Sequence, residues 1–330
     1  MTSLTPYLTP HKLGRPVLTG SGLPGAFDER AVDVPFVFEH RGAYYMTFVG
    51  FDGKGYQTAL ACSEDLLHWE KLGVILARGE GNGWDEANAA GCWLLCENDL
   101  DAPRILTQWE GKYWLAYHSY PGEGYEAGPA RFGLAWTEDE SLMTWHRLPE
   151  PFLRPEEGED WERGGLYKEC LLRHDGLFYL FYNAKDSHAM EQTGLATSPD
   201  LQTWTRYGDN PVLRTTPGAW DSRFRSDPCV VRHEDHWVMF HFGYDGRHAQ
   251  EGIAFSDDLR HWEQHPEPIL TVGPEGSLDS LHAHKPAVLK RDGVLYHCYC
   301  ACRPHHQGDP TNNGGEFRCI TVATSSPVTS

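Results

Sequence analysis

The stretch GLYKECLLRHDGLFYLFYNA, from Gly165 to Ala184, decides the fold class, because it places an acid before a hydrophobic run, a turn and a second, aromatic-rich run. Aromatic and β-branched runs bounded by Gly and Asp are typical of two antiparallel strands joined by a hairpin. The pattern recurs along the chain, and five copies predict a repeat architecture of four-stranded units. The leading residues of the copies are separated by 68, 68, 58 and 58 positions and are Asp33, Asp101, Glu169, Asp227 and Lys285.

The two ends of the chain complement each other. Each copy continues into a third and a fourth run, but the last copy ends at its third run, CITVATSSP from Cys319. The segment KLGRPVL, Lys12 to Leu18, matches the ends of the fourth runs, such as NPVL from Asn210. An N-terminal strand at about residues 12–18 would complete the last unit and remove an exposed edge. The sequence therefore predicts an all-β fold: a five-bladed β-propeller of four-stranded antiparallel blades, closed by the N-terminal strand, with residues 1–330 as a single domain.

Composition narrows the class of partner. The chain carries 28 Lys and Arg against 47 Asp and Glu, a net charge of −19, without a basic stripe. Nucleic acid and anionic membranes are therefore not expected as partners. The sequence has no run of 18 apolar residues, and its start lacks the apolar core of a signal peptide, so we expect a cytoplasmic protein. The nine cysteines are expected to be reduced, and the pattern predicts no particular oligomeric state.

Repeated and unrepeated features point to different roles. An aromatic or apolar residue followed by an acid comes after the fourth run of every copy, which favours packing between blades, with Trp84 or Trp161 on a sugar face as the alternative. The segments that differ between copies, 77–100, 121–130 and 303–317, are expected to set specificity. The repeated pairs are Phe27-Asp28, Trp84-Asp85, Trp161-Glu162, Trp220-Asp221 and Leu278-Asp279.

The leading residues are the candidates for chemistry, because they differ between copies. An acid that starts a strand can simply cap a turn, and for Asp227 this interpretation and a functional one both stay open. Three acids directed toward one axis repel one another, which favours a functional role for Asp33, Asp101 and Glu169 together. Paired carboxylates suit glycoside cleavage, and Glu169, with its longer side chain and apolar neighbours, is the candidate acid.

The order Asp, Asp, Glu on the first strands of three successive units resembles the propeller glycosidases of glycoside hydrolase families 43 and 32. Glu169-Cys170 resembles the acid motif of the family 32 fructosidases, and Asp101-Ala-Pro resembles their Arg-Asp-Pro, with Leu100 in place of the Arg. The resemblance implies hydrolysis of terminal sugars from short oligosaccharides without a required cofactor. It assigns Asp33 as base or nucleophile, Asp101 as modulator and Glu169 as acid.

Two alternatives remain. DAPRI, from Asp101, resembles the mannoside phosphorylases of family 130, whose cationic residues hold phosphate, and a carbohydrate-binding propeller without activity is the other alternative. His282 and His284 alternate onto one strand face, as a metal pair or as substrate contacts. The family 43 resemblance implies a structural calcium ion in the central channel, with His284 as its candidate ligand. The CYCAC run from Cys298 has strand spacing and is not predicted to bind zinc. The candidate substrate-binding residues are Trp93, Arg104, Lys168, Arg225, Asp227, His284 and Lys285.

Overall fold

The computed structural model describes residues 3–81 and 83–328. Its regular structure is almost entirely strand, and the only helices in these residues are three single 3-10 turns, η1 (Thr5–Tyr7), η2 (Pro155–Glu157) and η3 (Asp160–Glu162). The predicted all-β class is confirmed. In the described part of the chain, no helix has the length and apolar character needed to cross a membrane.

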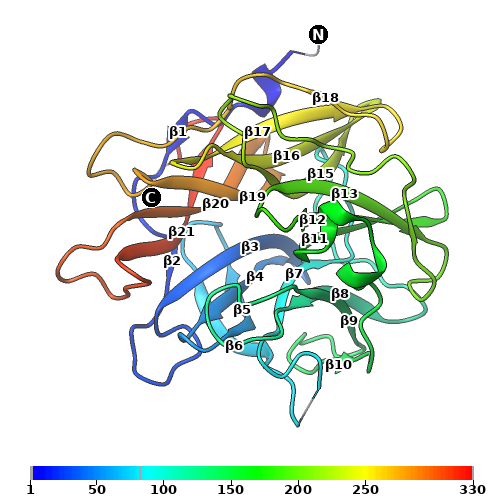
Figure 1. Ribbon diagram of the computed structural model, residues 1–330. Coiled ribbons are helices and arrows are strands. Elements are labelled where there is room, and N and C mark those ends of the chain that lie inside the picture. The colour runs from blue at the N-terminus through cyan, green and yellow to red at the C-terminus, as the bar shows by residue number, and fades with distance from the viewer. Residues whose placement is uncertain (1–2, 82, 329–330) are drawn as a thin grey trace.

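The strands fall into five antiparallel groups, and within each group the first strand lies toward the middle of the molecule and the last toward the outside (Figure 1). The first group is β3 (Ala31–His40), β4 (Ala43–Phe51), β5 (Tyr56–Ser63) and β6 (Glu70–Leu76). The second is β7 (Ala90–Leu94), β8 (Tyr113–Ser119), β9 (Arg131–Thr137) and β10 (His146–Arg147). The third is β11 (Gly165–His174), β12 (Leu177–Lys185), β13 (Glu191–Ser198) and β14 (Thr205–Arg206).

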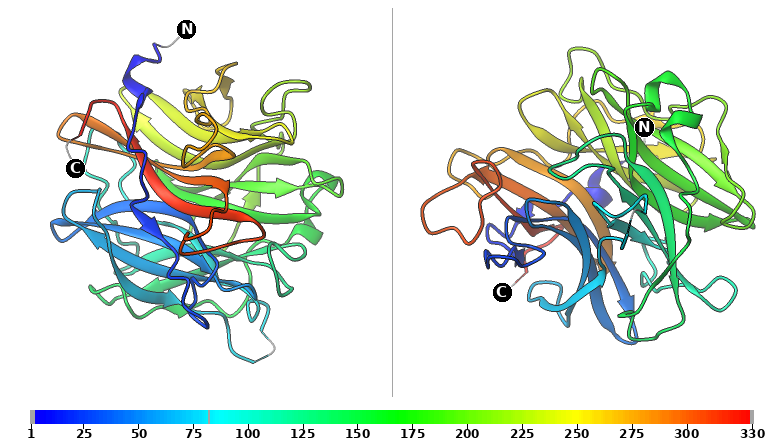
Figure 2. Two further views of the ribbon diagram at one scale, coloured as in Figure 1. Left: turned by 90° about the vertical axis from the view of Figure 1, so that its left-hand side faces the viewer. Right: turned by 60° about the horizontal axis from the view of Figure 1, so that its bottom comes forward.

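The fourth group is β15 (Phe224–His233), β16 (His236–Tyr244), β17 (Ala249–Ser256) and β18 (Glu263–Gln264), and the fifth is β19 (His282–Arg291), β20 (Val294–Pro304) and β21 (Glu316–Thr324). Two N-terminal strands, β1 (His11–Lys12) and β2 (Leu18–Thr19), pair with β21, so the blue N-terminal segment runs beside the red C-terminal strand in Figure 2. The inner strand β19 contacts β3. Within the residues described, hydrogen bonding joins the strands into three sheets, none of which closes on itself.

A repeated ion pair shows what β1 contributes. In three groups, a buried loop acid that precedes the inner strand binds a base on the outermost strand of the same group, at 2.5 to 3.2 Å. In the fifth group the acid is Asp279, and its base is Lys12 of β1, at 2.6 Å. Lys12 of β1 therefore takes the role that a base on the outermost strand has in the other three groups. The three other pairs are Asp28–Lys71, Asp85–Arg147 and Glu162–Arg206.

The tryptophans of the repeated aromatic–acid pairs pack inside the scaffold. Trp84 stacks on Tyr117 and Trp161 on Tyr182, with ring centroids 5.4 and 6.2 Å apart. A Cβ atom on Gly133 would lie 2.6 Å from the Trp84 ring, so the close approach requires glycine there. The predicted packing role is confirmed for both tryptophans, and all nine cysteines are free thiols.

A β-bulge interrupts each inner strand and corrects the predicted register of the repeat. In four of the five strands, the bulge contains a residue with positive φ, namely Val34, Lys168, Asp227 or Lys285. A bulge redirects the side chains around it. Asp33 comes one residue before this position and Glu169 one residue after it, so the leading residues are not equivalent. The prediction that they occupy one common place was wrong, because an offset of one residue reverses the direction of a strand side chain.

The prediction that Asp101 starts an inner strand was also wrong. The inner strand of the second group is β7, inside the segment 77–100 that differs from the other copies, and Asp101 lies in the connection from β7 to β8. The apolar residues after Asp101 suggested a strand, but Ile105 and Leu106 make only isolated bridges, to Glu39 and Cys96.

Candidate active site

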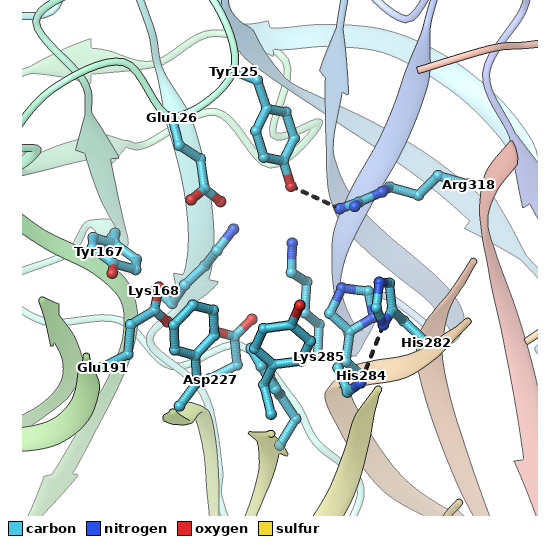
Figure 3. A pocket seen from close by; sticks show the side chains of 14 residues that line it. Tyr125, Glu126, Tyr167, Lys168, Glu191, Asp227, His282, His284, Lys285 and Arg318 are labelled. Atoms are coloured by element: carbon cyan, nitrogen blue, oxygen red, sulfur yellow. Dashed lines mark hydrogen bonds between the residues drawn. The ribbon is translucent and has the colours of Figure 1, made fainter. Parts of the chain in front are cut away.

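A cavity of about 290 Å³ opens where the inner strands β11, β15 and β19 begin. Charged side chains from six parts of the chain point into it (Figure 3). The loop between β8 and β9 contributes Tyr125 and Glu126, the start of β13 contributes Glu191, and β21 contributes Arg318. The bulges of the inner strands contribute Lys168, Asp227 and Lys285.

Two cations that line the cavity share one buried carboxylate beside it. Oδ2 of Asp33 accepts hydrogen bonds from Lys285 Nζ and Arg318 Nη1, each at 2.6 Å. Burial alone would raise the pKa of Asp33, but Lys285 and Arg318 outweigh it and hold this pKa well below its usual value. Arg318 also donates to the Tyr125 hydroxyl at 3.0 Å. Asp33 therefore fixes two cationic side chains beside the cavity.

Two glutamates share one lysine at the cavity wall. Lys185 Nζ lies 3.6 Å from Glu126 Oε2 and 3.3 Å from Glu191 Oε1. Burial tends to raise the pKa of Glu126, but Lys185 and Lys168 hold it below its usual value. Burial raises the pKa of Glu191, even though Lys185 opposes the shift. The environment thus separates the pKa values of the pair, as in acid and base pairs of enzymes.

Asp227 is a third carboxyl group of the cavity. Its Oδ1 accepts a hydrogen bond from Asn183 Nδ2 at 2.6 Å, and Oδ2 has no partner among the described residues. Burial raises the pKa of Asp227 to about 7, against the opposing charges of Lys168 and Lys285. A buried carboxyl group with an open oxygen can bind a hydroxyl group of a sugar.

Glu169 does not line this cavity. It lies in the channel between the inner strands, beside a space of about 20 Å³ that is also lined by Trp93, Pro228 and Pro286. Its Oε1 accepts a hydrogen bond from the Cys92 backbone N–H at 3.2 Å, and its Oε2 is hydrogen-bonded to His118 Nδ1 at 3.1 Å. The Glu169 side chain is fully buried. Burial lowers the pKa of His118, although Glu169 opposes the shift.

Asp101 lies far from the other predicted catalytic residues. Its carboxylate is half exposed and contacts Lys290 at 2.5 Å and His233 at 3.4 Å. These two residues lie at or near the ends of β19 and β15, whereas the cavity lies at their beginnings. Asp33 and Glu169 thus lie next to residues that line the cavity, whereas Asp101 lies at the opposite end of the inner strands.

Three predicted substrate-binding residues, Trp93, Arg104 and Arg225, also lie outside the cavity. The Arg104 guanidinium packs over the rings of Trp93 and Phe36, at 5.5 and 5.7 Å, inside the core. Arg225 is buried and pairs with the loop acid Asp221. Lys168, Asp227, His284 and Lys285 line the cavity, and their role as substrate contacts stays a prediction.

The residues around His284 do not fit a calcium ion. Calcium prefers six to eight oxygen ligands. The ligand atoms that lie within 4.8 Å of one another here are those of His284, Cys300 and Cys302, and His284 Nδ1 is hydrogen-bonded to the Cys300 carbonyl. Burial, Lys285 and Arg318 together hold the pKa of His284 well below its usual value, and the same positive charges oppose a divalent cation.

Sequence reasoning missed Glu126, Glu191, Lys185 and Arg318. A usable signal existed for Glu191. The equivalent position in each third strand lies seven residues before its last residue. Glu191 is the only acid among these five positions. It could therefore have been found in the same way as the leading residues, by looking for positions at which the copies differ. For Glu126 the signal was weaker, since the loop was singled out but not its acid. The set from the third strands is Tyr56, Ala130, Glu191, Ala249 and Phe317.

Comparison with known proteins agrees with this scaffold. The model for the glycosyl hydrolases family 32 N-terminal domain matches residues 96–277, more than half of the chain. The chain belongs to this family. The resemblance of this family 32 chain to propeller glycosidases is thus confirmed. A solved structure described as a glycoside hydrolase is 30% identical to it, with a TM-score of 0.81 over 97% of this chain and 93% of the other.

Two curated relatives of this family 32 chain carry different activities in their names. Sucrose-6-phosphate hydrolase of Zymomonas mobilis is 30% identical over 176 residues, 49% of this chain and 32% of the relative. The 1,2-beta-oligomannan phosphorylase of a Thermoanaerobacter species is 28% identical over 185 residues, 54% of this chain and 50% of the relative. The matches therefore span about a third and a half of these relatives.

Proposed function

We propose that this chain is a glycoside hydrolase that removes a terminal sugar within the cavity, with Glu126 and Glu191 as its catalytic carboxyl groups. The scaffold would be a five-bladed propeller whose ring β1 and β2 close. The observation that carries the proposal is the pair of glutamates that share Lys185 and whose pKa values are shifted in opposite directions. Membership in a family of glycosyl hydrolases supports the reaction class.

The two shifts assign the roles. Glu126, with its lowered pKa, is ionised and attacks the anomeric carbon, while Glu191, with its raised pKa, protonates the leaving oxygen. The ionised Glu191 then takes a proton from water, which hydrolyses the glycosyl ester on Glu126. Their oxygens near Lys185 lie at most about 7 Å apart, the sum of the two distances to Nζ. Retaining enzymes have carboxyl groups about 5 Å apart and inverting enzymes roughly 6.5–9.5 Å apart, so this upper limit is compatible with the retaining mechanism proposed.

The size of the cavity supports action on a terminal sugar. Its volume of about 290 Å³ lies at the lower end of the range for small-molecule sites, which is roughly 300–1,000 Å³. The site therefore suits one sugar unit rather than the middle of a long chain.

A panel of aryl glycosides tests this function on the wild type, Glu126→Gln and Glu191→Gln. Each substitution should lower kcat by about 10²- to 10⁴-fold on the sugar that the wild type cleaves. Glu123→Gln is the matched control, because Glu123 lies in the same loop, is exposed and does not line the cavity. For Glu191→Gln the loss should shrink with dinitrophenyl glycosides, whose leaving group needs no proton. Wild-type rates in both glutamine variants would refute the assignment.

Phosphorolysis is the second candidate function. The cations Lys168, Lys285 and Arg318 gather in the cavity, and one relative is named as a phosphorylase. The panel is therefore run with and without inorganic phosphate. A product that is a sugar phosphate, formed only when phosphate is present, would replace hydrolysis by phosphorolysis. If the wild type cleaves nothing but binds sugar, the interpretation as a non-catalytic carbohydrate-binding propeller would replace both.

A further inference from the structure

Lys168 is a buried cation that points into the cavity (Figure 3). The residue is 7% exposed and occupies the bulge of β11 with a φ of 56°. Positive φ is unfavourable for a residue with a side chain. The same position holds Val34 in β3, which is also buried, so the backbone geometry belongs to the scaffold and a charged side chain is not needed to form it.

The Lys168 ammonium group has no ion-pair partner within 4.0 Å in residues 3–81 and 83–328. The other cations beside the cavity are paired: Lys185 with two glutamates, and Lys285 and Arg318 with Asp33. Burying a charge without a partner costs free energy. Lys168 is therefore available to pair with a negative group that enters the cavity.

Three cations gather in this cavity of an acidic protein, beside the carboxyl groups of Glu126, Glu191 and Asp227. The protein carries a net charge of −19, yet Lys285 and Arg318 share the single carboxylate of Asp33, and Lys168 adds a further positive charge beside them. Lys185 is shared by Glu126 and Glu191, and Lys285 and Arg318 are held by Asp33, which leaves the Lys168 ammonium group as the cation that an anionic ligand in the cavity can pair with.

We infer that Lys168 binds an oxyanion, which is either a carboxylate or phosphate group carried by the sugar or a free phosphate that acts as acceptor. Lys285 and Arg318 line the same cavity as Lys168, and so do the proposed catalytic glutamates Glu126 and Glu191. The inference rests on the proposed function only for the nature of the sugar. The oxyanion site itself is tested by binding, without any turnover.

Calorimetric titration provides the test. The ligands are galacturonate and glucuronate, their neutral counterparts galactose and glucose, and inorganic phosphate. The wild type should bind at least one uronate or phosphate, and should bind no neutral sugar as tightly as its uronate. Lys168→Gln should weaken oxyanion binding by about 10- to 100-fold, the range for a hydrogen bond to a charged group, and leave any neutral sugar unchanged.

Two further variants serve as controls for this test. Lys168→Arg retains the charge and should bind the oxyanion within about fivefold of the wild type, which separates a lost charge from a damaged bulge. Lys112→Gln removes a lysine that lies over the Trp136 ring, outside the cavity, and should leave binding unchanged. If Lys168→Gln and Lys112→Gln weaken oxyanion binding equally, the effect comes from the net charge of the protein and the inference is wrong.

The remaining outcomes separate the sources of the oxyanion. Uronate binding with a product that is a free sugar acid places the oxyanion on the substrate, whereas phosphate binding together with phosphate-dependent cleavage assigns it to the acceptor. If the wild type binds neither uronate nor phosphate, or prefers neutral sugars, the inference is wrong even when hydrolysis proceeds. If Glu126→Gln and Glu191→Gln keep full activity while oxyanion binding depends on Lys168, the catalytic assignment fails and the oxyanion site stands.

Discussion

Replacing Lys12 by Met should destabilise the whole protein, because Lys12 ties the N-terminal strand to the last group of strands. Lys12 Nζ lies 2.6 Å from Asp279 Oδ2 and donates to the Thr271 carbonyl at 2.5 Å. The Asp279 side chain is 4% exposed, so the substitution leaves a buried carboxylate without its cation. Removing one partner of a fully buried ion pair costs about 3–5 kcal/mol.

Two features reduce the cost in this case. Asp279 keeps hydrogen bonds from the Tyr299 hydroxyl at 3.0 Å and the Ser277 hydroxyl at 3.1 Å, and the Lys12 side chain is 28% exposed. We therefore expect a loss of about 2 kcal/mol, since partial exposure weakens ion pairs. For a chain of this size, that corresponds to a decrease in Tm of about 4 °C.

Thermal unfolding followed by circular dichroism measures this effect. Lys54→Met is the control, because Lys54 is exposed and makes no ion pair in the described residues, and it should leave Tm within about 1 °C. Lys71→Met removes the corresponding base of the first group and should resemble Lys12→Met. If Lys12→Met matches Lys54→Met instead, the N-terminal strand does not hold the last group in place.

Two further predictions concern the pH dependence of the cavity. Burial raises the pKa of Asp227 to about 7, so between about pH 5 and 7 the native state holds a proton that the unfolded chain has already lost, and stability falls as pH rises through this range. Asp227→Asn should remove roughly 2–3 kcal/mol of this fall in urea unfolding, and equal falls in both proteins would refute the burial argument. Lys185→Met should raise the pKa of Glu126 and move the acid limb of kcat/KM upward by about one pH unit, which pH–rate profiles would show; an unmoved limb would mean that Lys185 does not hold Glu126 ionised.

The architecture was accessible from the sequence because it is repeated. Alternating apolar runs and turn residues predicted the strands, and the likeness of KLGRPVL to the fourth runs predicted that the N-terminus pairs with the last copy, as β1 and β2 do with β21. The aromatic–acid pairs were recognised as scaffold for the same reason. Repetition identifies positions that every copy needs, and such positions are held by packing and by local ion pairs.

The site was harder to predict, because side-chain direction depends on single-residue register. The acid at position 169 and the lysine at 168 are neighbours in sequence, but the bulge directs Lys168 into the cavity and leaves Glu169 in the channel below. Asp101 was placed on an inner strand because the actual strand, β7, is short and lies in a segment rich in Gly and Asn. Glu126 and Glu191 meet only through the tertiary fold, by way of Lys185.

The most direct test of the account compares kcat/KM of Glu191→Gln and Glu169→Gln on the same aryl glycoside. Both changes replace a buried glutamate of the third group by its amide, so they are matched in chemistry and differ in place. The account predicts a loss of about 10²- to 10⁴-fold for Glu191→Gln and a loss of less than about tenfold for Glu169→Gln. A large loss in Glu169→Gln with near wild-type activity in Glu191→Gln would indicate that Glu169 is the catalytic acid and would contradict the assignment of catalysis to Glu191.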